Sequence, residues 1–486
     1  MDTTINSEKI NHPYKEISFF YSPWYTVILS VFVYLFWLFD LGVYGLTVMI
    51  VLAGVICALC KDLSPIIPIS FVFVQVVSDT LGAAYAYIYY ICSFVLLIAG
   101  VVIHFIRFKP YRNYGKVKGF PVAVGLCGIA ILFGGITIAP ERSLFPALIV
   151  VFYGLLATGS GFFFYATLGQ KDSKRLRNTV IGAILASSCI AFIQLITLIL
   201  SSDNPMQAIS SKYELNAGYG HPNYLANIIA RSIPLCIYLS VSNKKYSFLW
   251  LVAAYVCGIG IILTSSRATL LVAFIVSVIC LVYFFRKLDY KVNWICTVVM
   301  LIGVTMVGLA VVYNKLETMF STLFNMGLDS NGRFDLWKIG MERFASHPIF
   351  GVGLDYDLGG REDLTNTAFT PYWYHNTFVQ ILCSLGIFGF IAYGFYFYRQ
   401  YRTFAVSKNN AVKSLMFVII LMQGISMLDI FFLTPQEFLQ MVIITTVALR
   451  SLPENKENTH IYEIIEFAKK HDRLNIFKKL KRRTEK

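Results

Sequence analysis

Long apolar runs, separated by short polar stretches, repeat along almost the whole 486-residue chain. A helix needs about 20 consecutive apolar residues to cross the hydrocarbon core of a membrane. The pattern therefore predicts fourteen spanning helices, of which the third is the shortest. The predicted spans are residues 24–41, 43–60, 66–80, 84–106, 119–138, 145–168, 178–200, 223–242, 246–264, 268–285, 294–313, 376–398, 411–428 and 432–449.

The basic residues support this topology, because short cytoplasmic loops of membrane proteins collect Lys and Arg. With the N-terminus inside, all but nine of the 41 Lys and Arg residues fall in predicted inner loops or terminal segments. The nine are Arg142, Lys212, Arg231, Arg267, Lys315, Arg333, Lys338, Arg343 and Arg361. Both termini are therefore predicted to be cytoplasmic. The formal net charge of +14 is mostly a topology signal and does not predict nucleic-acid binding.

The composition agrees with this class, because 57% hydrophobic and 14% charged residues exclude an ordinary soluble domain. The predicted fold is an all-α, polytopic integral membrane protein with about 14 (12–14) transmembrane helices. Its predicted parts are a cytoplasmic arm (1–23), helices 1–11 (24–313), a large outer loop (314–375), helices 12–14 (376–449) and a cytoplasmic tail (450–486). The tail mixes apolar residues with clustered Lys and Arg, which favours an amphipathic helix on anionic lipids over a partner-binding segment.

The large outer loop carries helical patterns of its own. The segment KLETMFSTLFN has the apolar spacing of a helix lying in the membrane surface. A second helix is predicted through GRFDLWKIGMERF, capped by Ser330 or Asn331 and ending near His347 and Pro348. Its predicted apolar stripe consists of Phe334, Trp337, Met341 and Phe344. A long loop with such helices is typical of a lid or an active-site element.

Three arginines on the outer side are candidates for binding an anion. Arg267 lies in LTSSRATLL at a tight hairpin, where it could also simply anchor a helix end. Arg333 opens the loop helix, where a cation opposes the helix dipole, so a ligand or a salt bridge to Asp335 or Asp329 is expected. Arg231 lies about 12 Å below the start of its helix and must face protein or a polar cavity.

Two histidines are candidates for acid-base chemistry. His375 belongs to PYWYHNTFVQ, where the chain re-enters the membrane, with Asn376 beside it and Gln380 one turn further on. A general base for a hydroxyl would be needed at such a boundary. His221, in GYGHPN, is a weaker candidate because this motif also makes a good start for a helix. The aromatic residues Tyr372 to Tyr374 fit an interfacial belt better than sugar stacking. Asp355 and Asp357 form a DxD pair, for which a solvated loop is favoured over a metal site.

The chain resembles the O-antigen ligase and O-antigen polymerase superfamily. The resemblance rests on the topology, the SSRA hairpin, the outer loop with GRFDLW and SHPIFGVG, and the YHNTFVQ helix start followed by Gly386 and Gly389. Members transfer a glycan from an undecaprenyl-pyrophosphate carrier to an acceptor hydroxyl at the outer membrane face, without a metal or nucleotide. The resemblance implies that Arg267 and Arg333 are the essential arginines, and that His375 is the essential histidine.

These residues give a predicted site in which guanidinium groups hold the pyrophosphate and His375 accepts the acceptor's proton in an inverting displacement. The expected substrate-binding residues are Arg231, His221, Asn376, Trp337 and Gln380, with no metal and no cofactor. The expected partners are the lipid-linked donor, a glycan or lipid-linked acceptor, membrane lipids, a flippase and a chain-length regulator. No nucleic-acid partner is expected.

Three functions remain open from the sequence. The leading one is a polymerase of cell-surface polysaccharide, such as O-antigen, capsule, exopolysaccharide or a teichuronic-type wall polymer, in the bacterial cytoplasmic membrane. The second is a ligase that passes finished polymer to lipid A core or another acceptor. The third is a transporter or flippase, in which an intramembrane Arg231 would bind an anionic substrate. The inverted repeats and matching broken helices expected of a transporter are not visible in the sequence.

Overall fold

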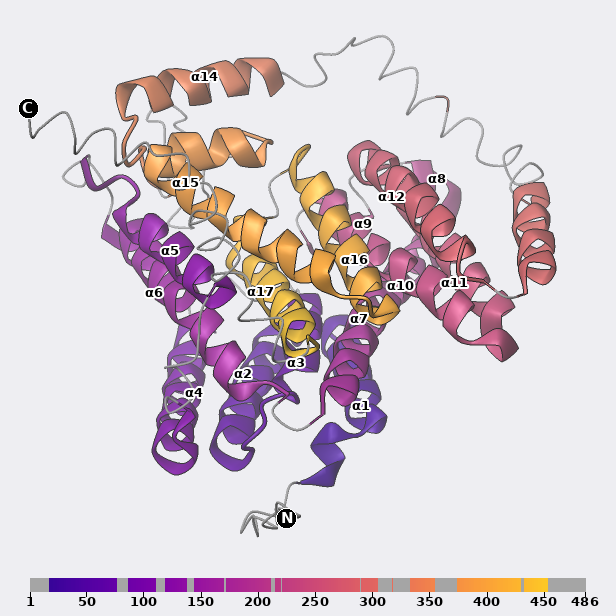
Figure 1. Ribbon diagram of the computed structural model, residues 1–486, viewed down its shortest axis with the longest axis horizontal. Helices are drawn as coiled ribbons and strands as arrows, with labels where there is room; N and C mark the ends of the chain where they lie inside the picture. Colours follow the sequence, from indigo (N-terminus) through magenta and orange to yellow (C-terminus); the bar gives the residue numbers. More distant parts are fainter. Residues whose placement is uncertain are drawn as a thin grey trace, which may run out of the picture.

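The computed structural model describes residues 17–76, 86–110, 119–137, 144–169, 172–210, 215–219, 221–288, 290–304, 317, 333–354, 374–429 and 432–452. Within these residues every regular element is a helix (Figure 1). The longer helices are α1 (Pro23–Leu38), α2 (Gly42–Leu59), α4 (Ala86–Phe108), α5 (Phe120–Phe133), α6 (Leu144–Thr167), α7 (Ser173–Ser201), α10 (Ser232–Ser242), α11 (Ser247–Leu263), α12 (Arg267–Phe285), α14 (Arg333–Ser346), α15 (Thr377–Val406), α16 (Asn410–Ser426) and α17 (Pro435–Arg450). The shorter ones are α3 (Ile66–Val72), α8 (Pro205–Ser210) and α9 (Pro222–Ala230), with 3-10 helices η1 (Ser18–Tyr21), η2 (Phe73–Gln75) and η6 (Lys244–Tyr246).

Each of the fourteen predicted spans overlaps a helix or a pair of consecutive helices, although parts of some spans, such as residues 77–80 and 305–313, lie outside the described residues. Eight helices of the described chain are long and apolar enough to cross a membrane. Five more are shorter apolar helices, including the third, Ile66–Gln75, and Lys291–Val304. The all-helical fold is thus confirmed, whereas the number of complete crossings stays a prediction. The outer loop up to residue 332 (apart from Glu317), the DxD pair and the tail after residue 452 lie outside the described residues.

Polar residues at the helix starts explain several of the boundaries. The Asp172 carboxylate accepts hydrogen bonds from the backbone N–H groups of Lys174 and Arg175, which caps α7. Asn409 caps α16 in the same way. These side chains satisfy N–H groups that have no partner within the helix. Proline stands in the first turn of α1, α5, α9 and α17, where its missing N–H costs nothing.

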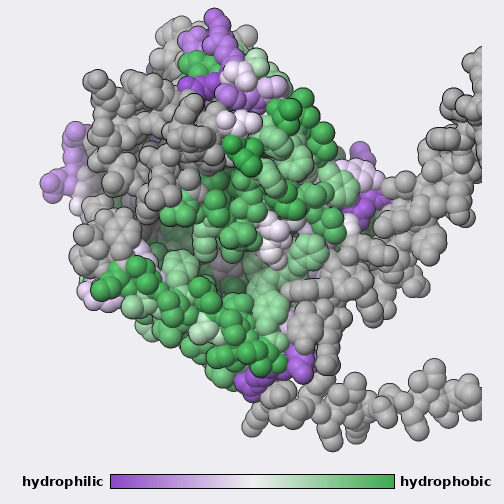
Figure 2. Space-filling view, turned by 90° about the vertical axis from the view of Figure 1, so that its left-hand side faces the viewer, coloured by the Kyte–Doolittle hydropathy of each residue, from purple (hydrophilic) through white to green (hydrophobic). Residues whose placement is uncertain are grey.

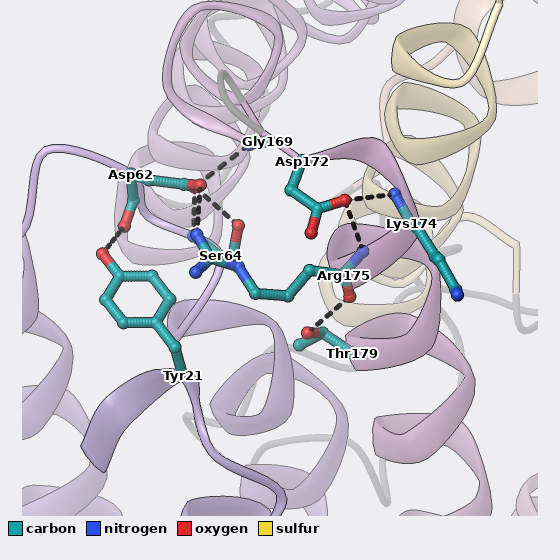
Figure 3. A network of polar contacts seen from close by, with 8 residues as sticks. All are labelled: Tyr21, Asp62, Ser64, Gly169, Asp172, Lys174, Arg175 and Thr179. Carbon is teal, nitrogen blue, oxygen red and sulfur yellow. Dashed lines mark hydrogen bonds and ion pairs between the residues drawn. The ribbon is translucent and has the colours of Figure 1, made fainter. Parts of the chain in front are cut away.

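One end of the bundle, here called the basic end, is tied together by the Asp62 network in Figure 3. The Asp62 carboxylate accepts from the N–H groups of Ser64 and Gly169 and lies 3.6 Å from the Arg175 guanidinium. The Tyr21 hydroxyl donates to the Asp62 carbonyl oxygen at 2.8 Å. The chain before α1, the α2–α3 turn and the α6–α7 region therefore meet at one end, as the alternating topology predicts.

The surface of the bundle is strongly apolar. The face shown in Figure 2 is covered mainly by hydrophobic residues, with hydrophilic residues gathered at its margins. On α4, the side chains of Ile88, Ile91 and Ile106 are 66%, 64% and 70% exposed. Isoleucine side chains exposed to this degree along a whole helix are expected to face lipid rather than water.

Helix α15 is broken at Gly386, and the segment 348–353 repairs the break. Gly386 has φ 65° and ψ −164°, which leaves backbone groups on both sides without helical partners. They are satisfied by Val352 N–H to Cys383 O, Gly353 N–H to Ser384 O, Ile387 N–H to Pro348 O and Phe388 N–H to Ile349 O. The SHPIFGVG motif and Gly386 therefore form one structural unit. It also joins α14, which lies across one end of the bundle, to α15 (Figure 1).

We expect Gly386→Ala to destabilise the protein by at least about 2 kcal/mol. An L-residue in the left-handed region costs about 1–2 kcal/mol, and the added Cβ would lie 2.3 Å from the Ile349 carbonyl oxygen. Gly394→Ala, on the same helix, is the matched control, because nothing lies within 4 Å of its Cβ. Thermal unfolding of the purified variants in detergent measures the difference. Equal unfolding temperatures for the two variants would show that the break at Gly386 carries no strain.

Candidate functional site

His375 and Asp429 form a hydrogen-bonded pair at the end of the bundle opposite the basic end, here called the site end. Nδ1 of His375 lies 3.0 Å from Oδ1 of Asp429. A carboxylate can only accept, so Nδ1 donates its proton to Asp429, and in a neutral imidazole with this tautomer the lone pair is on Nε2. The imidazole is 37% exposed and the carboxylate 14% exposed. A substrate can therefore reach Nε2, which has no hydrogen bond to a described residue, while the carboxylate is shielded.

The start of α15 fixes His375 against the end of α16. Asn376 caps α15 by accepting from two backbone N–H groups, and its Nδ2 donates to the Met427 carbonyl at 3.4 Å. The Thr377 hydroxyl donates to the Ser426 carbonyl at 2.7 Å. Because Met427 is two residues before Asp429, these bonds set the distance between the histidine and its carboxylate. Both Asn376 and Gln380 thus have structural roles at the site, the latter by accepting from Tyr374 N–H and donating to Ser384.

His375 itself has a strained backbone, with φ 48° in the left-handed region. A non-glycine residue in this region costs about 1–2 kcal/mol, and such strain concentrates at functional sites. The surrounding hydrogen bonds hold the strained residue in place. The strain therefore marks His375 as a position whose orientation is imposed by the fold.

The second oxygen of Asp429 is held by α9. Nδ2 of Asn223 donates to Oδ2 of Asp429 at 2.7 Å. His221 is the N-cap of α9, and its Nδ1 accepts from the Asn223 backbone N–H at 3.2 Å. His221 therefore stands next to the site, with one ring nitrogen used to cap a helix. His375, Asp429 and Asn223 are thus three side chains connected in series by hydrogen bonds, here called the His375–Asp429–Asn223 chain.

Arg333 and Arg267 lie close to the His375–Asp429–Asn223 chain. Burial lowers the pKa of the Arg333 guanidinium, the Asp429 carboxylate opposes the shift, and the Arg267 cation adds to it. The three charges are therefore near enough to interact electrostatically. Both arginines are half-buried. Neither has an ion pair or hydrogen bond with a described residue, so the expected salt bridge from Arg333 to Asp335 is absent, and Asp329 lies outside the described residues.

Arg267 also begins α12 in a way that favours an anion. Ser266, at the N-cap, does not cap the helix, because its hydroxyl donates to the Thr269 hydroxyl at 2.9 Å. The first N–H groups of α12 are therefore left without a side-chain acceptor. A helix N-terminus with free N–H groups attracts negative charge, and the Arg267 side chain adds a full positive charge at the same place.

Helix α14 holds Arg333 above the start of α15 by packing on Tyr374 and Val379. A Cβ at Gly340 would come within 2.7 Å of Val379 and 2.9 Å of Tyr374, so the two segments are in close contact. Trp337 belongs to this packing cluster and meets the ring of Phe334 edge-on at 5.2 Å. The predicted helix is confirmed, including its end before His347. Of the predicted stripe, Trp337 belongs to the packed face together with Leu336, Ile339 and Gly340, whereas Phe334 and Met341 are exposed.

Arg231 is not part of this group. It is 2% exposed and pairs with the equally buried Glu437, and its Nη1 donates to Gln440 Oε1 at 2.6 Å. Of the two environments expected from its depth, the structure shows contact with protein. The buried carboxylate compensates the charge of Arg231. The sequence-predicted residues that the structure brings together are His375, Arg333 and Arg267, with Asn376 and His221 beside them.

Three residues of the site and its surroundings were not found from the sequence: Asp429, Asn223 and Glu437. Asp429 gives a weak signal, because it is an acid in the short connection between two apolar spans. Glu437 is a carboxylate within a predicted span, which usually implies a partner or a function. Asn223 looks like an ordinary residue of a helix-start motif. Its role becomes visible only when α9 and the α16–α17 connection are placed together.

Comparison with known proteins supports the choice of this region as the candidate site. The family model for O-antigen ligase matches residues 251–394. This region contains Arg267, Arg333 and His375, together with Gly386, at which α15 is broken. No curated protein matches the chain. Residues 251–394, which are less than half of the chain, are thus similar to the O-antigen ligase family, and this match supports the resemblance to the O-antigen ligase and polymerase superfamily.

Proposed function

We propose that the protein polymerises a cell-surface polysaccharide. It transfers glycan repeat units from an undecaprenyl-pyrophosphate carrier to an acceptor sugar hydroxyl on the outer face of the bacterial cytoplasmic membrane. The observation that carries this proposal is the grouping of Arg267 and Arg333, both without a described ion-pair partner, with the paired His375 and Asp429. Two cations that have no ion-pair partner in the described part of the chain, next to a general base, suit a donor whose leaving group is an anion.

The reaction is a single displacement at the anomeric carbon. The acceptor oxygen attacks this carbon as its proton passes to Nε2 of His375. The bond from the anomeric carbon to the phosphate oxygen breaks, and the lipid pyrophosphate leaves with the electron pair. The resulting imidazolium is stabilised by Asp429, whose carboxylate accepts from Nδ1. Because attack and departure occur on opposite faces, the configuration of the anomeric carbon inverts.

The two guanidinium groups act on the leaving group. A pyrophosphate gains negative charge as the glycosidic bond breaks, so fixed cations bind the transition state more strongly than the ground state. Arginine suits this task because it stays protonated and donates bidentate hydrogen bonds to phosphate oxygens. These steps require no metal ion or cofactor.

The distribution of charge supports the orientation in the membrane. The basic end carries Arg175 and also Arg450, which hydrogen-bonds to the Tyr165 carbonyl at the end of α6. Lys and Arg gather on the cytoplasmic side of membrane proteins. We therefore place the basic end and both termini in the cytoplasm and the site end at the outer face. The polyprenyl chain of the donor would lie against the exposed apolar helices between the two ends.

A ligase is the second candidate, because the matching family is described as O-antigen ligase. It would use the same chemistry on a different acceptor, such as lipid A core. The transporter hypothesis loses its main support, because Arg231 is neutralised by Glu437 inside the bundle. A flippase that supplies the donor and a chain-length regulator are the partners that fit a polymerase.

Glycan analysis of a strain that lacks the gene distinguishes polymerase from ligase. We expect the surface lipid of the deletion strain to carry single repeat units, and long polymer to return with the wild-type gene. Long polymer that accumulates on its lipid carrier would instead identify a ligase. Unchanged surface and carrier glycans would contradict both functions.

A further inference from the structure

Helix α9 is a short arm whose direction is not set by the helix that follows it. It ends at Ala230, Arg231 forms a turn, and α10 begins at Ser232. The break follows from Pro234, whose ring would clash with the carbonyl of Ala230 and which has no N–H to donate to it. Because Asn223 lies in the first turn of α9, any change in the direction of this arm moves Asn223 relative to Asp429.

Two polar contacts fix the arm, one near each end. Asn223 binds Asp429 at the start of α9, and Arg231 binds Glu437 at its end. Both contacts join the same two parts of the chain, and the residues are eight positions apart on each side. On the α9 side eight residues of helix rise about 12 Å, whereas on the other side the helix α17 begins only at Pro435. The two contacts, here called the upper rung (Asn223 with Asp429) and the lower rung (Arg231 with Glu437), therefore hold α9 at two points about 12 Å apart along its axis.

The ion pair of Arg231 and Glu437, the lower rung, joins two helices at a high cost in desolvation free energy. Burying an ion pair carries a large desolvation penalty, and apolar residues of similar size often stabilise a protein as much or more. Here Arg231 and Glu437 are each 2% exposed, and Arg231 Nε and Glu437 Oε2 have no hydrogen-bond partner among the described residues. Gln440 extends the contact by accepting from Arg231 and donating to the Ser70 carbonyl of α3. Such a pair is therefore expected to add little stability over apolar residues of similar size.

The face of α9 between the two rungs carries a buried polar residue, Asn227. Asn227 lies four residues from both Asn223 and Arg231, which places the three side chains on one stripe of the helix. It is fully buried, and both its amide atoms lack a hydrogen-bond partner among the described residues. The middle of this face therefore provides no directional contact. A further hydrogen bond, from the Ser188 hydroxyl to the Ile228 carbonyl oxygen at 2.6 Å, joins α9 to α7. The polar side-chain contacts that set α9 against Asp429 and α17 are the two rungs.

We propose that the ion pair of Arg231 and Glu437 positions the hydrogen-bonded pair of His375 and Asp429 for catalysis. It holds α9 in the register in which Asn223 binds Oδ2 of Asp429 and leaves Oδ1 for His375. This inference rests on the proposed function and assigns Arg231 a role other than contact with the substrate. It predicts that changes at this pair reduce turnover without weakening the binding of the donor.

The test is steady-state kinetics of the purified full-length protein with a polyprenyl-pyrophosphate oligosaccharide donor. In the double variant Arg231→Met/Glu437→Leu the buried charges are replaced by apolar side chains, so folding is expected to survive. We expect kcat to fall by about 100-fold, the loss typical of a displacement of about 1 Å at a catalytic group, with KM for the donor unchanged. The exchanged pair Arg231→Glu/Glu437→Arg should recover most of this loss.

Gln400→Leu is the matched control, because Gln400 is fully buried and hydrogen-bonds to Tyr396 and Thr445 in a different polar contact of the bundle. It should lower the unfolding temperature without changing the kcat of the folded protein. A raised KM for the donor in the double variant, with kcat unchanged, would show that Arg231 contacts the substrate and would overturn the proposal. Wild-type kcat and KM in the double variant would also overturn it. Retention of activity by His375→Ala would instead contradict the proposed function.

Discussion

Replacing Asp429 by asparagine should lower kcat by about 10³- to 10⁴-fold while leaving the KM for the donor nearly unchanged. In serine proteases the corresponding change costs a similar factor, because the amide stabilises the wrong tautomer of the histidine. Here the introduced amide would donate to Nδ1 of His375, so the proton would move to Nε2, which must accept the proton of the acceptor hydroxyl. The measurement is single-turnover kinetics with a labelled lipid-linked donor.

Asp335→Asn is the control for this variant, because Asp335 is an exposed carboxylate on α14 with no ion pair to a described residue. It should transfer glycan at the wild-type rate. His375→Ala should lose as much activity as Asp429→Asn, and the double variant should lose little more, because residues that act as a unit are not additive. Independent, additive losses would show that the two side chains do not act together.

Removing either arginine of the anion site should cost about 3 kcal/mol of transition-state stabilisation, or about 100-fold in kcat. We therefore expect Arg267→Ala and Arg333→Ala to be inserted and folded but slow. Lysine at either position should restore only part of the rate, because it keeps the charge but loses the bidentate geometry. Turnover of the purified variants, normalised to the folded protein, measures the effect.

Lys338→Ala is the control for charge alone, since Lys338 is a cation on the same helix as Arg333. It should retain wild-type turnover. If Lys338→Ala slowed transfer as much as Arg333→Ala, the effect would come from the general positive potential of α14. A specific contact with the pyrophosphate would then be excluded.

The fold was largely predictable because lipid imposes a simple rule on sequence. Each spanning helix must satisfy its own backbone and present apolar side chains, so the positions of the helices can be read directly from the chain. The break of α15 was less visible. Gly386 alone does not predict it, because its unpaired backbone groups are satisfied by a segment more than thirty residues earlier in the chain. Such pairing depends on tertiary structure.

The site was predictable only in part, for a related reason. Arg267, Arg333 and His375 are unusual for their positions, so each could be found singly. Asp429 and Asn223 are ordinary residues in the sequence, and their place at the site becomes visible only because Asp429 contacts both His375 and Asn223. Arg231 is as unusual as the other arginines, and its partner Glu437 lies more than two hundred residues away. A single sequence shows that a buried charge needs a partner, but it does not show which residue the partner is.

The central claim is that Arg267 and Arg333 together hold the donor's pyrophosphate, and comparison of two donors tests it most directly. The wild-type protein is given the same oligosaccharide on a polyprenyl pyrophosphate and on a polyprenyl monophosphate, and kcat/KM is measured for each. The account predicts a strong preference for the pyrophosphate, on the order of 100-fold or more, that largely disappears in the Arg267→Ala/Arg333→Ala variant. An equal preference in the wild type and the double variant would contradict it.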